Sequence, residues 1–246
     1  LEYWMPVDWY NGGMEHTTLH LLYSRFIYKF LFDIGAVPKA CGSEPYRKRT
    51  SHGLILGEGG EKMSKSRGNV VNPDTVVEQY GADVLRLYEM FIGPFEQPAA
   101  WDTKGIVGIR RFLERVWAIG EAVPKASPVG GMPAALEQQL HAAMGKISSD
   151  IEALRLNTAV STLMVLANAL AGQPTPDRHA YETFLILLAP FAPHLAEERW
   201  SRLGHADSVF HQPWPVADPA KAKASEATVV VQVDGRVRAS LRLPAG

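Results

Sequence analysis

Apolar residues recur with helical spacing through most of the second half of the chain. The 3.6-residue period is clear in residues 109–117, 136–154 and 156–170, where polar side chains fill the opposite faces. A further helix is expected over residues 180–203, and Pro190 and Pro193 should kink or split it. The pattern therefore predicts a helical bundle.

The first 93 residues follow a mixed pattern. A helix is expected from about residue 15 to residue 34, ending before Gly35, and a short buried strand is expected at 51–56. Two further helices are predicted at 74–80 and 82–92. An α/β domain is therefore expected before the bundle.

Local signals define where these elements begin and where the domain ends. Asn72 and Pro73 have the character of an N-cap and a first helical residue. Gly93, Pro94 and Pro98 indicate a domain boundary, because glycine and proline interrupt regular structure.

The last part of the chain predicts a linker and a hairpin. Residues 212–227 are rich in proline, alanine and lysine, as linkers are. Strands are expected at 228–233 and 236–243, on either side of an Asp234-Gly235 turn. One face of the second strand carries three arginines, Arg236, Arg238 and Arg242. They are either a solvated face or contacts for phosphate groups.

Composition narrows the class of protein. The 246 residues are 46% hydrophobic, enough for a core and about two domains, and the formal net charge of −1 excludes a uniformly basic nucleic-acid binder. Cys41 is the only cysteine, which excludes an intrachain disulfide and a Cys-pair zinc site. Neither a signal peptide nor a membrane-spanning apolar run is present, so a cytoplasmic protein without a membrane partner is expected.

The most informative segment is a basic loop at residues 62–69. Lys62 and Lys65 can present ammonium groups to phosphoryl oxygens, and Ser64 and Ser66 can donate hydroxyl hydrogen bonds. Gly68 lets the backbone approach a ligand closely. A solvated loop is the alternative for a run of this composition, whereas the order of residues favours phosphate binding.

A second group of candidate residues lies near the start of the chain. Gly12 and Gly13 permit close approach of a ligand to the backbone, and Glu15 follows them. His16 and His20 are four residues apart, so they are expected to share one helical face. No HExxH pattern and no third ligand accompany them, so no metal site is expected. A partly buried helix face is the alternative interpretation of this pair.

Two strings carry a family resemblance. Residues 62–66 are identical to the KMSKS signature of class I aminoacyl-tRNA synthetases, and residues 6–26 match the string PVDxYxGGxEHxxLHLLYxRF at every fixed position. The second string resembles leucyl-tRNA synthetases, whereas the first is shared with enzymes for valine, isoleucine and methionine. The resemblance extends along nearly the whole chain, including residues 81–86, 154–159 and 189–198.

The resemblance implies roles for these residues. Lys62 and Lys65 would be catalytic and would stabilise the charge on departing pyrophosphate, and the ATP-binding set would be Lys62, Met63, Ser64, Lys65, Ser66, Gly12, Gly13 and Glu15. His16 and His20 would line the leucine pocket. The substrates would be leucine, ATP with Mg²⁺, and tRNA(Leu). Gly57, Gly59 and Gly60 would provide the hinge of a mobile loop.

Basic residues elsewhere are weaker candidates for tRNA contact. Arg47, Lys48 and Arg49, with Lys39 nearby, form a cluster beside the strand predicted at 51–56. A solvated loop is at least as good an interpretation, as it is for the three arginines of the final strand.

The resemblance also implies that parts of the enzyme are missing. Neither a HIGH motif nor an editing insertion is found, so the chain resembles the C-terminal portion of such an enzyme. The expected division is the second half of a Rossmann-like domain (1–93), an anticodon-binding-type helical domain (94–215), a linker (216–227) and the start of a small C-terminal α/β module (228–246). The N-terminal half would then be supplied in cis or as a separate subunit.

Two alternatives to an ATP-dependent leucine–tRNA ligase segment remain. A non-catalytic tRNA-binding fragment or subunit would keep the bundle and the basic patches. A class I synthetase for another aliphatic amino acid would keep the lysine-serine loop, although the histidine-bearing string argues against it.

Overall fold

The computed structural model describes residues 1–123, 131–223, 226–233 and 236–244. The side chains of residues 226–233 and 236–244 lie outside the description, except that of Arg238. The chain forms two compact units, one made of residues 1–73 with 92–103 and the other of residues 74–91 with 104–246. Each unit is described by itself.

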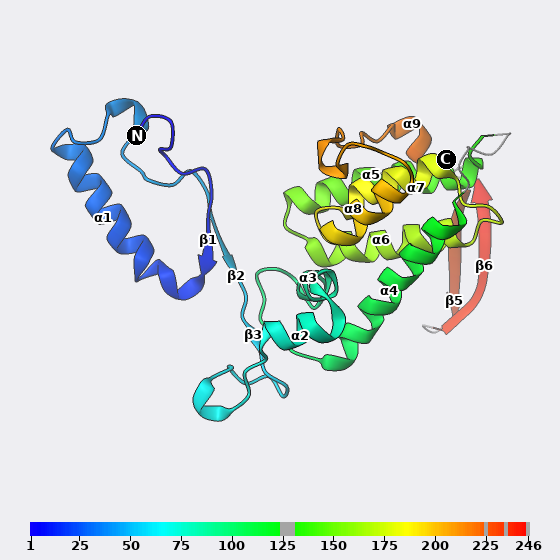
Figure 1. Cartoon of the computed structure of the whole chain (residues 1–246), viewed down its shortest axis with the longest axis horizontal. Coiled ribbons are helices and arrows are strands. Elements are labelled where there is room, and N and C mark those ends of the chain that lie inside the picture. The colour runs from blue at the N-terminus through cyan, green and yellow to red at the C-terminus, as the bar shows by residue number, and fades with distance from the viewer. Residues whose placement is uncertain (124–130, 224–225, 234–235, 245–246) are drawn as a thin grey trace. The chain divides into compact units, whose positions relative to one another are not determined.

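The first unit contains short strands and one long helix. Its elements are β1 (Tyr10–Gly13), η1 (Met14–Thr17), α1 (His20–Asp33), η2 (Lys39–Cys41), β2 (Arg49–His52), β3 (Ile55–Leu56), η3 (Lys65–Arg67) and β4 (Ala99–Ala100). Strands β1 and β2 pair in parallel, with Tyr10 opposite Arg49, and β3 pairs in parallel with β4. Figure 1 shows α1 as the chain's crossover between β1 and β2, as parallel pairing requires.

The helix predicted over residues 15–34 is wrong at its start. Residues 14–17 form the 3-10 turn η1, and α1 begins only at His20 after Leu19 adopts φ −111° and ψ −106°. The hydroxyls of Thr17 and Thr18 bond locally, to the sulfur of Met14 and the carbonyl of Glu15. Such bonds compete with helix formation, and both threonines are β-branched.

The single buried strand predicted at 51–56 is also wrong. It is two half-buried strands in different sheets, β2 and β3, separated by Gly53. The Gly53 amide donates to the carbonyl of Phe95 at 2.8 Å, and a Cβ on Gly53 would lie 2.0 Å from the carbonyl oxygen of Gln97. This close approach of two backbones requires glycine and interrupts the strand.

The second unit contains the helices predicted for the bundle, together with the two helices predicted at 74–80 and 82–92. Its helices are α2 (Pro73–Tyr80), α3 (Ala82–Phe91), α4 (Thr103–Ala122), α5 (Ala134–Glu152), α6 (Leu156–Ala171), α7 (Arg178–Leu188), α8 (Pro193–Arg202), η4 (Val209–His211) and α9 (Pro219–Ala222). Helix α6 packs against α5, α7 and α3, and α7 packs against α8. The helices predicted after Pro73 and the split near Pro190 are confirmed.

The apolar stripes form the core of this unit. Ile109, Phe112, Leu113 and Val116 are buried on α4, as are the predicted positions of α6 from Val160 to Leu170. The α5 stripe is buried only as far as Ile147. Its predicted continuation fails because α5 ends at Glu152 and Leu154 lies in the turn with φ +55°. None of the described helices combines the length and apolarity that a membrane span needs.

The end of the chain contains the predicted pair of strands. Strands β5 (Glu226–Val233) and β6 (Arg236–Pro244) pair antiparallel, with an irregularity between Val231 and Gln232. The predicted Asp234-Gly235 turn lies outside the described residues. Before the hairpin, residues 214–222 contact α5: Trp214 donates to Ser148 at 2.8 Å, and Lys221 pairs with Glu137 at 2.7 Å.

A glycine on α4 makes room for a buried arginine. A Cβ on Gly120 would lie 2.5 Å from both the Arg199 Nε and the Tyr181 hydroxyl oxygen. Neither group can move freely, because Tyr181 donates to the Val116 carbonyl and Arg199 pairs with Glu121. The Arg199 side chain also lies over Trp117, at 4.7 Å from the ring centroid. Burial raises the pKa of Tyr181 to about 12.

Substituting alanine for Gly120 is expected to lower the free energy of unfolding by about 1–3 kcal/mol, through overpacking. Gly108 is the matched control, since it lies exposed on the same helix with open space around it. Gly108→Ala should instead stabilise by about 0.5–1 kcal/mol, because alanine is the better helix former. Urea unfolding of both variants measures the difference, and equal effects would contradict the packing argument.

Candidate functional site

The lysine-serine loop is a closed structure in the first unit. Ser64 is extended, residues 65–67 make one 3-10 turn, and Gly68 returns the chain in the left-handed region at φ +66°. The Asn69 side chain then accepts a hydrogen bond from the Ser64 amide at 2.9 Å and donates to the Lys62 carbonyl at 3.4 Å. Ser64 and Ser66 share a hydroxyl hydrogen bond of 3.1 Å. Hydrogen bonds within the loop therefore define its backbone.

The two candidate catalytic lysines remain available on this loop. Lys62 and Lys65 are exposed, and within the described part of the chain neither forms a hydrogen bond or ion pair through its side chain. The third cation of the loop, Arg67, pairs with Glu61 at 3.0 Å. Two unneutralised ammonium groups three residues apart can attract phosphoryl oxygens.

The glycine pair ends strand β1. A Cβ on Gly13 would lie 2.3 Å from a carboxylate oxygen of Glu15, so that carboxylate folds back against the Gly13 backbone. A Cβ on Gly12 would make ordinary contacts with Tyr10 and His16. The close approach predicted for this pair is therefore occupied, at Gly13, by the protein's own acidic side chain.

The two histidines do not share a helical face, so that prediction is wrong. His16 lies in η1, half-buried, and its Nδ1 is buried without a hydrogen-bond partner. His20 begins α1, stacks on Tyr10 with ring centroids 5.5 Å apart, and its Nδ1 lies 2.9 Å from the Tyr10 hydroxyl. Of the two Nδ1 atoms, that of His16 is buried and lacks a partner among the described residues, whereas that of His20 is bonded.

Ion pairs hold α1 to the loop that follows it. Arg25 and Lys29 both contact Glu44 at 2.6 Å. Hydrogen bonds from Arg25, and then from Lys29, lower the pKa of Glu44 to about 2. On the same side, Tyr46 donates to the Ser24 hydroxyl at 2.9 Å. These contacts fix the helix that begins at His20.

The basic cluster proposed for tRNA contact is partly neutralised. Arg47 pairs with Asp8 at 3.0 Å, Lys48 lies 4.9 Å from the centre of the Trp9 ring, and Arg49 donates to Thr17 at 2.8 Å. Lys39 is exposed in η2.

The arginines of the final strand can be followed only in part. Arg238 is exposed. The side chains of Arg236 and Arg242 lie outside the described residues.

The candidate site residues form two groups, and contacts are found within each group. Glu15 lies against Gly13, and Ser64, Ser66 and Asn69 of the loop form one hydrogen-bonded group. Across the described residues, no hydrogen bond or ion pair links the glycine-histidine group to the lysine-serine loop.

Comparison with known proteins gives matches in both units. Residues 28–101 match the family model of class I tRNA synthetases (I, L, M and V), and residues 134–246 match that of the anticodon-binding domain of tRNA ligase. A leucine–tRNA ligase of Alkaliphilus oremlandii is 50% identical over 241 residues, 98% of this chain, and one of Chlorobium phaeobacteroides is 47% identical over 250 residues. This chain is therefore similar to leucine–tRNA ligases over nearly its whole length. It spans 29% and 30% of the length of these two relatives, so it corresponds to a segment of them.

Solved structures agree with this similarity. The ternary LeuRS-tRNA-LeuAMS complex of Agrobacterium radiobacter K84 agnB2 LeuRS superposes with a TM-score of 0.83 at 32% identity, over 99% of this chain and 33% of that one. A methionyl-tRNA synthetase of Mycobacterium tuberculosis superposes with a TM-score of 0.59 at 19% identity. The match includes 82% of this chain and 45% of the methionyl enzyme. The second likeness concerns the fold alone.

Sequence reasoning missed a buried carboxylate in the second unit. Asp83 on α3 accepts hydrogen bonds from the Leu195 amide at 2.7 Å and from the His194 ring at 2.8 Å, at the first turn of α8. Arg86 on α3 also donates to the Pro190 carbonyl at 2.9 Å. Both segments carried the family resemblance, but their pairing across 111 positions leaves no periodic signal in the sequence.

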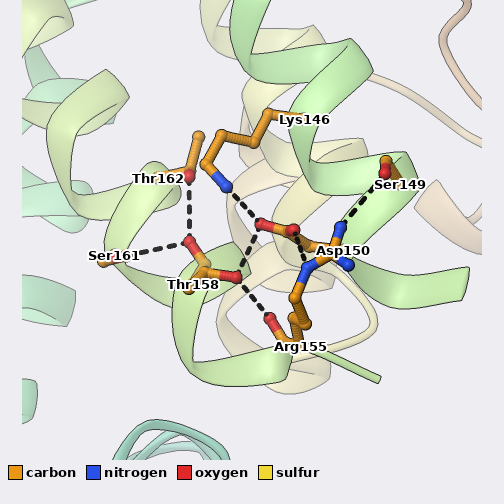
Figure 2. A network of polar contacts seen from close by, with 7 residues as sticks. All are labelled: Lys146, Ser149, Asp150, Arg155, Thr158, Ser161 and Thr162. Carbon is orange, nitrogen blue, oxygen red and sulfur yellow. Dashed lines mark hydrogen bonds and ion pairs between the residues drawn. The ribbon is translucent and has the colours of Figure 1, made fainter. Parts of the chain in front are cut away.

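A second buried carboxylate organises the turn between α5 and α6. Figure 2 shows Asp150 receiving Lys146 Nζ at 2.7 Å, Arg155 Nε at 2.8 Å and the Thr158 hydroxyl at 2.7 Å. Burial alone would raise the pKa of Asp150, but these hydrogen bonds outweigh it and the pKa is lowered. The i,i+4 spacing of Lys146 and Asp150 was a signal for one bond of this network.

Proposed function

We propose that this chain is the segment of a leucine–tRNA ligase that binds the phosphates of ATP during leucine activation. In the complete enzyme, a carboxylate oxygen of leucine attacks the α-phosphorus of ATP. The bond to the β-phosphate breaks, and pyrophosphate leaves as leucyl-adenylate forms. A ribose hydroxyl at the 3′ end of tRNA(Leu) then attacks the leucyl carbonyl carbon, and AMP leaves as the leucyl ester forms. The observation that carries the proposal is the closed loop with Lys62 and Lys65 exposed and unpaired.

Lys62 and Lys65 would act on the leaving group. Negative charge develops on the β-phosphate oxygens as the bond breaks, and preplaced ammonium groups stabilise that charge. Met63, Ser64 and Ser66 would complete the ATP-binding loop, with the two hydroxyls as donors. ATP would enter as its Mg²⁺ complex, so the metal would arrive with the substrate.

The glycine-histidine group would hold leucine and the adenylate. Gly12, Gly13 and Glu15 would contact the adenylate: Gly12 leaves its backbone open to the nucleotide, and the Glu15 carboxylate, which lies against Gly13, can accept hydrogen bonds from ribose or amine donors. His16 and His20 would line the leucine pocket. The unused Nδ1 of His16 and the bonded Nδ1 of His20 support different roles for the two rings.

An exposed apolar stripe on α1 supports a covering part of the same enzyme. Leu19, Leu22, Tyr23, Phe26, Ile27, Phe30 and Ile34 are 49% to 69% exposed and recur at helical spacing. Stripes of this kind are normally buried against another element. The remainder of a Rossmann-like domain, in cis or as a separate subunit, would cover this stripe. The boundaries between the functional domains would lie near residues 93, 215 and 227.

The helical bundle, the basic cluster at residues 47–49 and the C-terminal hairpin would contact tRNA. Arg47, Lys48, Arg49 and Arg238 are the described basic candidates, and Arg236 and Arg242 would join them on the hairpin. Their contacts would be with phosphate groups, which supply affinity that falls as salt rises.

The test is leucine-dependent exchange of pyrophosphate into ATP. We expect no exchange by the 246-residue chain alone and measurable exchange when the N-terminal part of a leucine–tRNA ligase is added. Salt-sensitive tRNA binding, together with no pyrophosphate exchange when the chain and the added N-terminal part are folded and associated, would instead favour a non-catalytic tRNA-binding segment. Exchange with valine or isoleucine in place of leucine would contradict the substrate assignment.

A further inference from the structure

The amide of Asn69 closes the phosphate-binding loop from its far end. Its oxygen accepts from the Ser64 amide and its nitrogen donates to the Lys62 carbonyl, at 2.9 and 3.4 Å. These two backbone groups flank Met63, so one side chain fixes both ends of the three-residue segment from Lys62 to Ser64. The lysines lie at the start of that segment and directly after it. A single amide therefore sets the backbone positions from which both lysines extend.

The base of the loop is shaped to receive this amide. Gly57 is buried, its amide donates to the Glu61 carbonyl at 2.8 Å, and a Cβ there would lie 3.0 Å from Asn69 Nδ2. Gly59 and Gly60 differ from Gly57: both have positive φ, +89° and +80°, and open space around them. Gly57 thus packs against the Asn69 amide, whereas Gly59 and Gly60 form a turn that the Gly60 amide closes by donating to the Gly57 carbonyl at 3.0 Å.

We propose that Asn69 is a positioning residue that holds Lys62 and Lys65 together as one preformed phosphate-binding unit. This inference rests on the proposed function of the loop. Lysine side chains are flexible and carry their donors at the end of four carbons, so a fixed backbone reduces what must be ordered when ATP binds. Preorganised donors stabilise a transition state without reorganising during the reaction.

Two variants at this position separate the two bonds. Asn69→Ala removes both, whereas Asn69→Asp keeps the acceptor for Ser64 but places an oxygen against the Lys62 carbonyl. Hydrogen exchange of the Ser64 amide, measured on the 246-residue chain, reports the first bond directly. We expect faster exchange in Asn69→Ala and protection retained in Asn69→Asp. Unchanged protection in Asn69→Ala would overturn the closing role.

Activity is measured as pyrophosphate exchange in the complemented enzyme. Both variants should lower kcat by about tenfold, the size of roughly one lost hydrogen bond expressed in the transition state. The KM for leucine and the melting temperature should stay unchanged, because the loop contributes little to the core. A merely structural role would move the melting temperature and leave the rate of the folded enzyme intact, and that outcome would overturn the proposal.

Glu61→Gln is the matched control, since it breaks the exposed Glu61–Arg67 pair in the same loop and leaves the Glu61 carbonyl in place. Exposed pairs of this kind contribute little, so wild-type kcat is expected. Lys65→Ala in the same assay separates the two proposals. A wild-type rate in Lys65→Ala would remove the loop from catalysis altogether, while a slow Lys65→Ala beside a fast Asn69→Ala would overturn only the positioning role.

Discussion

Lys65→Ala is expected to lower the rate of leucine-dependent pyrophosphate exchange by roughly 100- to 1,000-fold in the complemented enzyme, equivalent to about 2.7–4 kcal/mol of transition-state stabilisation. The reason is electrostatic. Lys65 begins the 3-10 turn of the loop, is exposed and has no side-chain partner among the described residues. Its charge is therefore available for the oxygens of the leaving pyrophosphate.

The loss should fall mainly on kcat. Charge on the leaving group is greater in the transition state than in bound ATP, so removing the ammonium group costs more stabilisation there. Arg67→Gln is the comparison variant, because Arg67 occupies the same turn but is paired with Glu61. It should change the rate by no more than a few-fold. Equal losses in the two variants would indicate a general charge effect and would remove the specific assignment to Lys65.

The second large effect is expected at Asp83. Asp83→Ala should lower the free energy of unfolding by about 2–4 kcal/mol, because the carboxylate satisfies the exposed end of a helix from another part of the chain. The N-cap residue of α8, Ala192, has no side chain that can cap. Pro193 has no N–H, and the amides of His194 and Leu195 both point to Asp83, at 3.4 and 2.7 Å. Removing Asp83 leaves these amides without their acceptor.

Chemical unfolding of the purified chain measures this loss. Asp218→Ala is the matched control, since Asp218 also caps a helix, through a 2.8 Å bond from the Ala220 amide, but is exposed at the short helix α9. Water can replace that bond, so a loss below about 1 kcal/mol is expected. Asp83→Asn should fall between the two, because it keeps an acceptor and loses the charge. A loss at Asp83 no greater than that at Asp218 would contradict the buried-cap argument.

Most of the proposed chemistry could be predicted from the sequence alone. The order of lysine and serine in the loop predicts phosphate binding because those side chains have few other uses in a polar run. The helical stripes predicted the bundle, since an apolar face at 3.6-residue spacing has to be buried. Where prediction failed, local bonds decided the outcome: Thr17 and Thr18 bond to their own turn, and the helix begins at His20.

What the sequence by itself determined is the set of local patterns: the helices, the glycine-rich turns, the loop and the family resemblance. Each depends on neighbours within a few positions. Only the tertiary structure decided that Asp83 caps α8, that Gly120 makes room for Arg199, and that Asn69 folds back on Ser64 against Gly57. These contacts depend on how close separate backbones come. The spacing of side chains along the chain does not reveal such distances. An aspartate or an asparagine is the same residue in the sequence whether its side chain faces water or caps a helix.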